Sequence, residues 1–345
     1  MAFSFFWSGK RELVSRAVVV QSPLFGGFAV VDIKLKVWSL LGQWVKRFAS
    51  SPSGWVLSMS YWFSNRLDAS PMEVFSRPFS FSPSRLPPFY KSLLSAWRGL
   101  DGSFSATRDS LVFGLSSCHA CSPVSGMSTK LCYLYLLSEH LVPPHCVEKF
   151  APAYGALYWP TTWRSLNFLD LDRQVIDLNW KIAHGVLYTA QRLVSFGLSI
   201  PLACFCGAPV ESLEHLFFYC PLAQSVLSWL QSLMFCFSPM CPVILCRHVL
   251  FGFNSDELRA VPRIFVYLLF VCKFLIWQSR NDFRFRDVRP GATSIIVQVK
   301  ARVRFNLPLF FKRFKSPRRK RYFNRQWGAR GVVATVTAGQ LTLSL

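Results

Sequence analysis

The chain has 345 residues, of which 52% are hydrophobic and 16% aromatic, so it carries enough apolar surface for two or three domains and is not globally disordered. Its formal net charge of +22 points to a polyanionic partner, either nucleic acid or an acidic membrane surface. Eleven cysteines, an odd number, and no signal-peptide pattern argue against a secreted disulfide scaffold. We therefore expect the protein in the nucleus or cytoplasm.

The first segment, residues 1–68, is predicted to hold a short strand, a turn and a helix. The β-branched residues of Val18–Val31 indicate the strand, and Pro23–Gly27 indicates the turn. Leu35–Phe48 places its large apolar side chains on one face at helical spacing. The next segment, residues 69–157, begins with serine and proline, which disfavour regular structure, so it is predicted to be a linker and a weakly ordered region.

Three helices are predicted in residues 158–235. Apolar residues recur at helical spacing in Asp170–His184. Thr189–Phe196 is a shorter helix that ends before Gly197, where a left-handed residue is expected. Cys220–Phe235 is the third helix, with a proline in its first turn.

The longest predicted helix covers Asp256–Phe285, with Ser255 as a possible N-cap and Pro262 near its start or at a bend. Its apolar core, Ile264–Trp277, has 14 residues and includes a lysine. A membrane span needs about 20 apolar residues, so a buried helix is favoured and a membrane partner is disfavoured. A second short strand is predicted at Ile295–Val303.

Three cysteines and one histidine form the most informative pattern, C-x-C-x8-H-x4-C. Cys204, Cys206, His215 and Cys220 together supply a complete tetrahedral ligand set for one Zn²⁺ ion. A site with four protein ligands has no open position, so the zinc is predicted to be structural. The alternative is a set of buried free cysteines, because C-x-C is less usual in zinc knuckles than C-x2-C.

Other candidate residues are given structural roles. Asp170 and Asp172 have no third metal ligand at plausible spacing and are predicted to cap the following helix. His184 is predicted to be a packed helix residue. A second group of cysteines and histidines begins with C-x2-C spacing but has no second pair of metal ligands at a regular spacing. Its members are predicted to lie in loops and core: Cys118, His119, Cys121, His140, His145 and Cys146.

The positive charge is concentrated at the C-terminal end. From Arg284 to Leu345 the chain has fifteen lysines and arginines and one acid, Asp287. Aromatic residues interleave with the cations of Phe310–Arg330, which suits unpaired or structured RNA better than duplex DNA. A localisation signal at Pro317–Arg321 is the plainer alternative. The predicted nucleic-acid contacts are Lys312, Arg313, Lys315, Arg318, Arg319, Lys320, Arg321, Arg325 and Trp327.

These patterns predict a mainly α fold, an irregular helical assembly with a small Cys-Cys-His-Cys zinc knuckle and a basic C-terminal tail. No polymerase Asp-Asp pair, phosphate-binding loop or hydrolase motif occurs, so no catalytic residue is predicted. The predicted division of the chain is 1–68, 69–157, a zinc-binding domain at 158–235, a helical region at 236–310 and a basic aromatic tail at 311–345.

Three blocks of sequence resemble the region downstream of the polymerase domain in LINE-type (non-LTR) retrotransposon proteins. The first resembles the segment after the thumb, the second the reverse transcriptase zinc-binding domain, and the third its Trp-x-x-Arg-Asn block. The blocks are Phe6–Lys10 with Gly26–Asp32 and Trp44, then Trp180–Gly185 with Leu193 and Cys204–Pro221, and then Ile276–Asn281 with Phe285.

The resemblance implies a non-catalytic, nucleic-acid-binding fragment that helps an upstream reverse transcriptase polypeptide to hold element RNA or target DNA. It carries Cys204, Cys206, His215 and Cys220 over as ligands of a structural zinc ion. Polymerase and endonuclease activities do not carry over, because their motifs lie outside this chain. Two alternatives stay open: a non-functional retroelement remnant, and a membrane-associated protein that uses the apolar segment 264–277.

Overall fold

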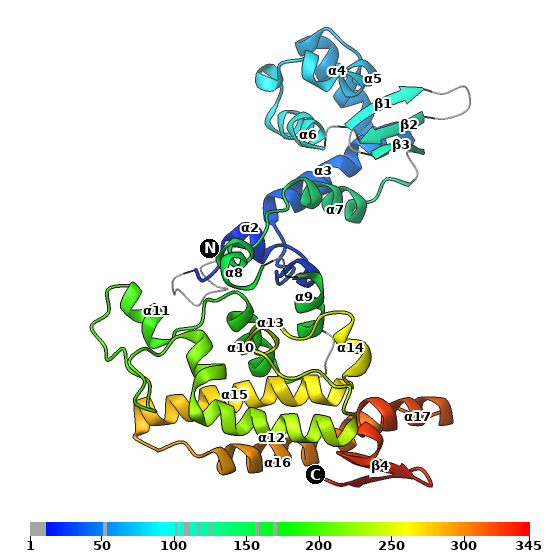
Figure 1. The fold of residues 1–345 in the computed structure, drawn as a ribbon. Coiled ribbons are helices and arrows are strands. Elements are labelled where there is room, and N and C mark those ends of the chain that lie inside the picture. Colours follow the sequence, from blue (N-terminus) through cyan, green and yellow to red (C-terminus); the bar gives the residue numbers. More distant parts are fainter. Residues whose placement is uncertain are drawn as a thin grey trace. The chain divides into compact units, whose positions relative to one another are not determined.

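A computed structural model describes residues 12–50, 54–100, 102–106, 111–115, 118–123, 126–155, 157, 159–167 and 171–345. The described chain is mainly helical, as predicted (Figure 1). It forms two compact units. The main unit comprises residues 12–18, 22–27 and 143–345, and the inserted unit comprises residues 19–21 and 28–142.

The inserted unit combines helices with a three-stranded antiparallel sheet of order β1-β2-β3. Its helices are α3 (Ile33–Ser50), α4 (Gly54–Leu67), α5 (Pro71–Ser76), α6 (Pro88–Gly99) and α7 (Thr129–Glu139), and its strands are β1 (Gly102–Ala106), β2 (Leu111–Leu115) and β3 (Cys118–Pro123). Helix α3, which the apolar periodicity predicted, packs against both α6 and α7. The 3-10 turns η2 (Pro78–Ser80) and η3 (Pro83–Arg85) precede α6.

Local signals explain why helices form in a region that we predicted to be a linker. Ser70 and Glu73 form a reciprocal capping box at the start of α5, and a proline occupies its first turn. Gly99, at the end of α6, lies against Trp38, and a Cβ atom built on this glycine would come within 2.2 Å of the indole ring. A single missing side chain therefore allows α6 to approach α3 closely.

The main unit is built from helices and one C-terminal hairpin. Its helices are α8 (His145–Tyr154), α9 (Trp159–Asn167), α10 (Arg173–Ala183), α11 (Ala190–Ser195), α12 (Pro221–Phe237), α13 (Cys246–Phe251), α14 (Glu257–Ala260), α15 (Arg263–Arg286), α16 (Ala292–Phe311) and α17 (Pro317–Gln326). Shorter elements are α2 (Arg16–Val19), which starts in this unit, η1 (Pro23–Phe25), the π-helical turn η5 (His215–Tyr219), η6 (Ala329–Gly331), β4 (Ala334–Thr337) and β5 (Gln340–Leu343).

Helices α12, α15 and α16 pack against one another and form the core of the main unit (Figure 1). Every residue of α15 from Ile264 to Ile276 is buried, including Lys273. This explains the continuous apolar run that the sequence shows. Among the residues that the structure describes, no helix is both long and apolar enough to cross a lipid bilayer.

Two strand predictions were wrong. The start of Val18–Val31 belongs to α2 and to the 3-10 turn η1. Ile295–Val303 lies inside α16, where tertiary packing overrides the strand preference of its β-branched residues. The buried residues of α16 recur every four positions at first, which is helical spacing: Ile295, Val299, Val303, Leu307 and Phe310.

The turn that carries η1 is fastened to helix α10. The indole Nε1 of Trp180 donates to the Gly26 carbonyl oxygen at 2.9 Å, and His184 Nε2 lies 2.9 Å from the same oxygen. The His184 ring also stacks on Trp163. Burial lowers the pKa of His184 to about 4, so the imidazole is a neutral packed group, as predicted.

Candidate metal centre and basic surface

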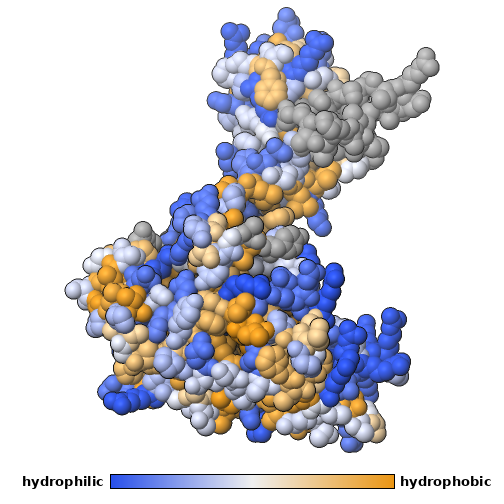
Figure 2. Space-filling model, in the orientation of Figure 1, coloured by the Kyte–Doolittle hydropathy of each residue, from blue (hydrophilic) through white to orange (hydrophobic). Residues whose placement is uncertain are grey.

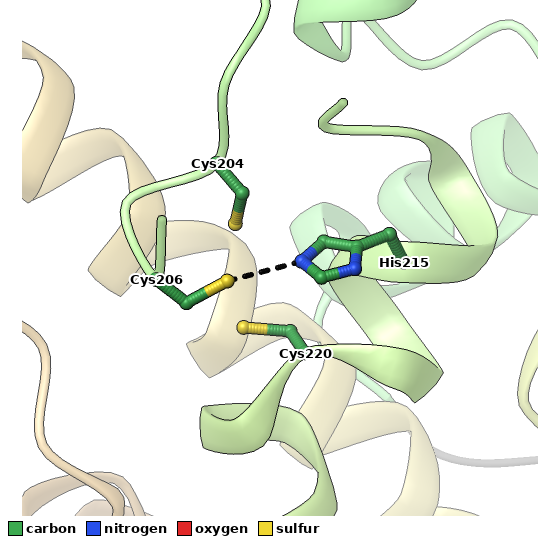
Figure 3. A group of neighbouring side chains, drawn as sticks. All are labelled: Cys204, Cys206, His215 and Cys220. Atoms are coloured by element: carbon green, nitrogen blue, oxygen red, sulfur yellow. Dashed lines mark hydrogen bonds between the residues drawn. The ribbon is translucent and has the colours of Figure 1, made fainter. Parts of the chain in front are cut away.

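The structure brings the four predicted zinc ligands together. One ligand atom from each of Cys204, Cys206, His215 and Cys220 lies within 4.8 Å of every other. Figure 3 shows the four side chains pointing toward a common centre. The Cys206 Sγ atom and His215 Nε2 are 3.2 Å apart. Three sulfurs and one imidazole nitrogen in this arrangement match the ligand set of a closed tetrahedral zinc site.

Local backbone structure accounts for the unusual C-x-C spacing. A tight turn follows Cys204, in which the Cys204 amide donates to Ala208 and the Gly207 amide donates back to Cys204. Gly207 has a φ of +93°, a conformation that favours glycine. This turn places Cys206 beside Cys204.

The second half of the cluster comes from two joined helical elements. His215 begins the π-helical turn η5, and the Cys220 amide donates to its carbonyl oxygen. Cys220 is then the N-cap of α12, with Pro221 in the first turn, as predicted. Leu216 and Phe217, between the two ligands, are fully buried and anchor the turn in the core.

The pKa values of two of the four clustered residues, Cys220 and His215, shift toward the form that binds zinc. The Cys204 thiol donates a hydrogen bond to Cys220, which lowers the pKa of Cys220 below its usual 9.0 and raises the pKa of Cys204. Desolvation lowers the pKa of His215, so its imidazole is neutral at pH 7. Thiolate and neutral imidazole are the forms that coordinate zinc.

A buried ion-pair network holds the cysteine loop against helix α15. The Glu211 carboxylate is fully buried and accepts from Arg280 at 2.6 Å and from the Ala190 amide at 2.9 Å. Arg284 donates to the carbonyl oxygens of Pro201 and Ala203, immediately before the first ligand. The Trp-x-x-Arg-Asn block therefore positions the loop that carries two of the four ligands.

The predicted nucleic-acid contacts have different surroundings. All the predicted cations are exposed except Lys320, which is half-buried. Figure 2 shows hydrophilic residues gathered over the α17 region at the lower right. Trp327 differs, because only 4% of its surface is exposed and its ring packs on Tyr267 and Phe310. This burial corrects the prediction that Trp327 stacks on bases.

The remaining candidates have structural surroundings where they are described. Cys146 Sγ lies 3.7 Å from His184 Nδ1 in the core. Asp172 occupies the N-cap position of α10, but its carboxylate accepts from Arg302 and not from a backbone amide of the helix. The side chains of Cys118, His119 and Cys121, all of Asp170, and the block at 6–10 lie outside the described residues.

Sequence comparisons agree with this geometry. Residues 160–227, which include all four clustered residues, match the family described as zinc-binding in reverse transcriptase. The chain is also 31% identical over 185 residues to a Xenopus laevis protein described as the transposon TX1 uncharacterized 149 kDa protein. That match covers 51% of this chain and 13% of the transposon protein. The chain is therefore a distant homologue of a transposon protein, and its residues 160–227 are a reverse transcriptase zinc-binding domain.

Proposed function

We propose that the chain is a non-catalytic, nucleic-acid-binding part of a LINE-type reverse transcriptase protein, built around one structural zinc ion. The observation that carries the proposal is the exposed cationic surface of α17 and the residues before it, on a unit that contains a reverse transcriptase zinc-binding domain. Element RNA and target DNA are the proposed partners, together with an upstream reverse transcriptase polypeptide.

Zinc and cations have separate roles in this proposal. The zinc ion joins the loop of Cys204 to the start of α12, and it has four protein ligands, so it supports the scaffold. Exposed cations of α17 bind phosphates and release their counterions. Arg318, Arg319 and Arg321 present three such charges within four residues of one helix. We expect this surface to supply most of the affinity.

The salt dependence of RNA binding tests this role of α17. The change replaces four cations with alanine: Arg318, Arg319, Lys320 and Arg321. Each phosphate contact contributes about 0.7 to 0.9 to the slope of log Kobs against log salt, so the slope should become shallower by about 3. Fluorescence anisotropy with a labelled RNA over a series of salt concentrations measures it.

The control removes the same charge from the inserted unit, where the structure also shows exposed cations. Alanine replaces Lys34, Lys36, Arg85 and Lys91. This control should leave the slope nearly unchanged. If both variants lower the slope equally, the effect reflects net charge alone and α17 is not the binding surface.

A further inference from the structure

A cavity of about 340 Å³ lies among α9, α14, α15 and α17 in the main unit. Its apolar part comes from Leu258, Val261 and Val266, and its polar edge includes the hydroxyls of Thr161 and Ser255. This volume falls in the range of small-molecule sites, which combine an apolar lining with a few polar groups. The volume of the cavity is therefore large enough for one planar heterocycle.

One wall of the cavity includes a partly exposed aromatic ring. Tyr322 of α17 lines the cavity and is 41% exposed. Its ring lies nearly parallel to Phe314, with an interplanar angle of 16°. The Arg263 guanidinium lies 5.5 Å from the centroid of the Tyr322 ring. These neighbours each cover part of the ring, and the exposed remainder of the Tyr322 side chain is the part that a ligand can contact.

Polar groups surround this wall. The Thr161 and Ser255 hydroxyl oxygens are 3.0 Å apart, and Arg164 adds an exposed positive charge at the rim. The Gln326 side-chain oxygen accepts from the Arg263 amide, which fixes the Gln326 side chain at the cavity. Hydroxyls can donate to and accept from the edge of a base or a ribose 2′-hydroxyl.

Helix α17 links the cavity to the cationic surface. Tyr322 and Gln326 are four residues apart and line the cavity, while Arg321 and Arg325, one position earlier, form the neighbouring exposed stripe. An RNA strand whose phosphates contacted Arg321 and Arg325 would therefore place its bases beside Tyr322. Bases within a duplex are already paired and stacked, so only an unpaired base reaches the ring.

We propose that this cavity binds one unpaired nucleotide of single-stranded RNA, with its base stacked on Tyr322 and its flanking phosphates on α17. This inference rests on the proposed nucleic-acid-binding function and goes beyond it, because it assigns a preference for unpaired RNA to a defined site. Binding of the nucleotide requires both stacking on Tyr322 and the open volume beside this ring.

The test compares the binding of the full chain to a single-stranded RNA and to the blunt-ended duplex of the same sequence. Tyr322→Leu removes the aromatic face, and Ser255→Trp fills the cavity. Each should weaken single-strand binding about five- to tenfold, the lower range of base–aromatic stacking, and leave duplex binding unchanged. Tyr322→Phe should bind like the natural chain. Tyr188→Leu is the matched control, since Tyr188 is 37% exposed and lies outside the cavity.

Direct contact has its own readout. A single-stranded RNA containing 4-thiouridine should photocrosslink to the peptide that carries Tyr322, and the crosslink should be lost in Ser255→Trp. Equal affinity for single strand and duplex, or unchanged single-strand binding by both variants with an unchanged far-ultraviolet circular dichroism spectrum, would overturn the cavity assignment alone. Absence of any RNA binding by the natural chain would instead overturn the proposed function.

Discussion

The four clustered residues carry the sharpest prediction at the residue scale. Replacing two of them in Cys206→Ser plus His215→Ala leaves only two of the four ligands, so zinc binding should be lost. Structural zinc contributes about 10–16 kcal/mol of apparent binding free energy in small domains, and the main unit should therefore be severely destabilised. Metal content measured by plasma mass spectrometry should fall from one zinc ion per chain to none.

Cys236→Ser is the control for this change. Cys236 is an exposed free cysteine of α12 outside the cluster, so its replacement should leave one zinc ion bound. Full zinc retention in the double variant, or no zinc in the natural chain, contradicts the assignment.

Sequence spacing was sufficient to find the residues of the cluster but not the residues that support them. The ligands lie within 17 residues of one another, whereas Glu211 and Arg280 are 69 positions apart. Only the fold shows that this acid and this base form a buried pair. Trp327 is a residue that the sequence assigned wrongly to the nucleic-acid contacts. Composition cannot show which aromatic rings of a basic segment face the core.

At the scale of elements, helix α15 contains a buried ionisable side chain whose effect on stability can be measured. Lys273 donates to the Val249 carbonyl oxygen at 2.7 Å, and burial lowers its pKa from the usual 10.5 to about 7. At pH values between these two pKa values, Lys273 carries its proton in the unfolded chain but loses it in the folded chain, so the unfolded chain binds more protons. Folding stability from this group should therefore rise with pH, by about 2 kcal/mol from pH 7 to pH 9.

Lys273→Met removes this contribution and keeps the shape of the side chain. Denaturant unfolding at both pH values should show that the natural chain gains about 2 kcal/mol more than the variant does. An equal change in both proteins would contradict the lowered pKa, because it would mean that Lys273 stays charged in the folded state up to pH 9.

Helix prediction succeeded where a one-sided apolar pattern and a terminal signal agreed. Helix α11 begins at the Thr189 cap and ends before Gly197, whose φ is +83°. The longest helix was placed correctly but starts later, because Pro262 ends the preceding segment and becomes the N-cap of α15. Strand prediction failed, because a β-branched run does not show whether its neighbours will be helices or strands.

At the scale of the whole molecule, the two units predict a local response to metal removal. A strong chelator should unfold the segment around Ala203–Trp229, because a zinc ion held by the four clustered residues would join its two halves. The helices of the inserted unit contain no residue of the cluster and should stay folded. Hydrogen exchange with and without the chelator measures this, as loss of protection in α12 with protection retained in α3 and α6.

A uniform loss of protection in both units would show that they unfold as one cooperative block. In that case the two units would be separate in structure but would not unfold independently. The natural chain with zinc restored is the control, and it should recover protection in α12.

The path of the chain through its two units has a consequence for how the protein can change. The main unit contains residues 22–27 and resumes at residue 143, so almost the whole of the inserted unit is an excursion from it. The Gln21 side chain, which belongs to the short stretch of the inserted unit before residues 22–27, donates to the carbonyl oxygen of Val142, the last residue of that excursion, at 2.8 Å. An excursion that leaves and returns at one point can lengthen, shorten or be exchanged with little change to its host. We therefore expect changes of length or sequence in the excursion to leave the shape of the main unit unchanged.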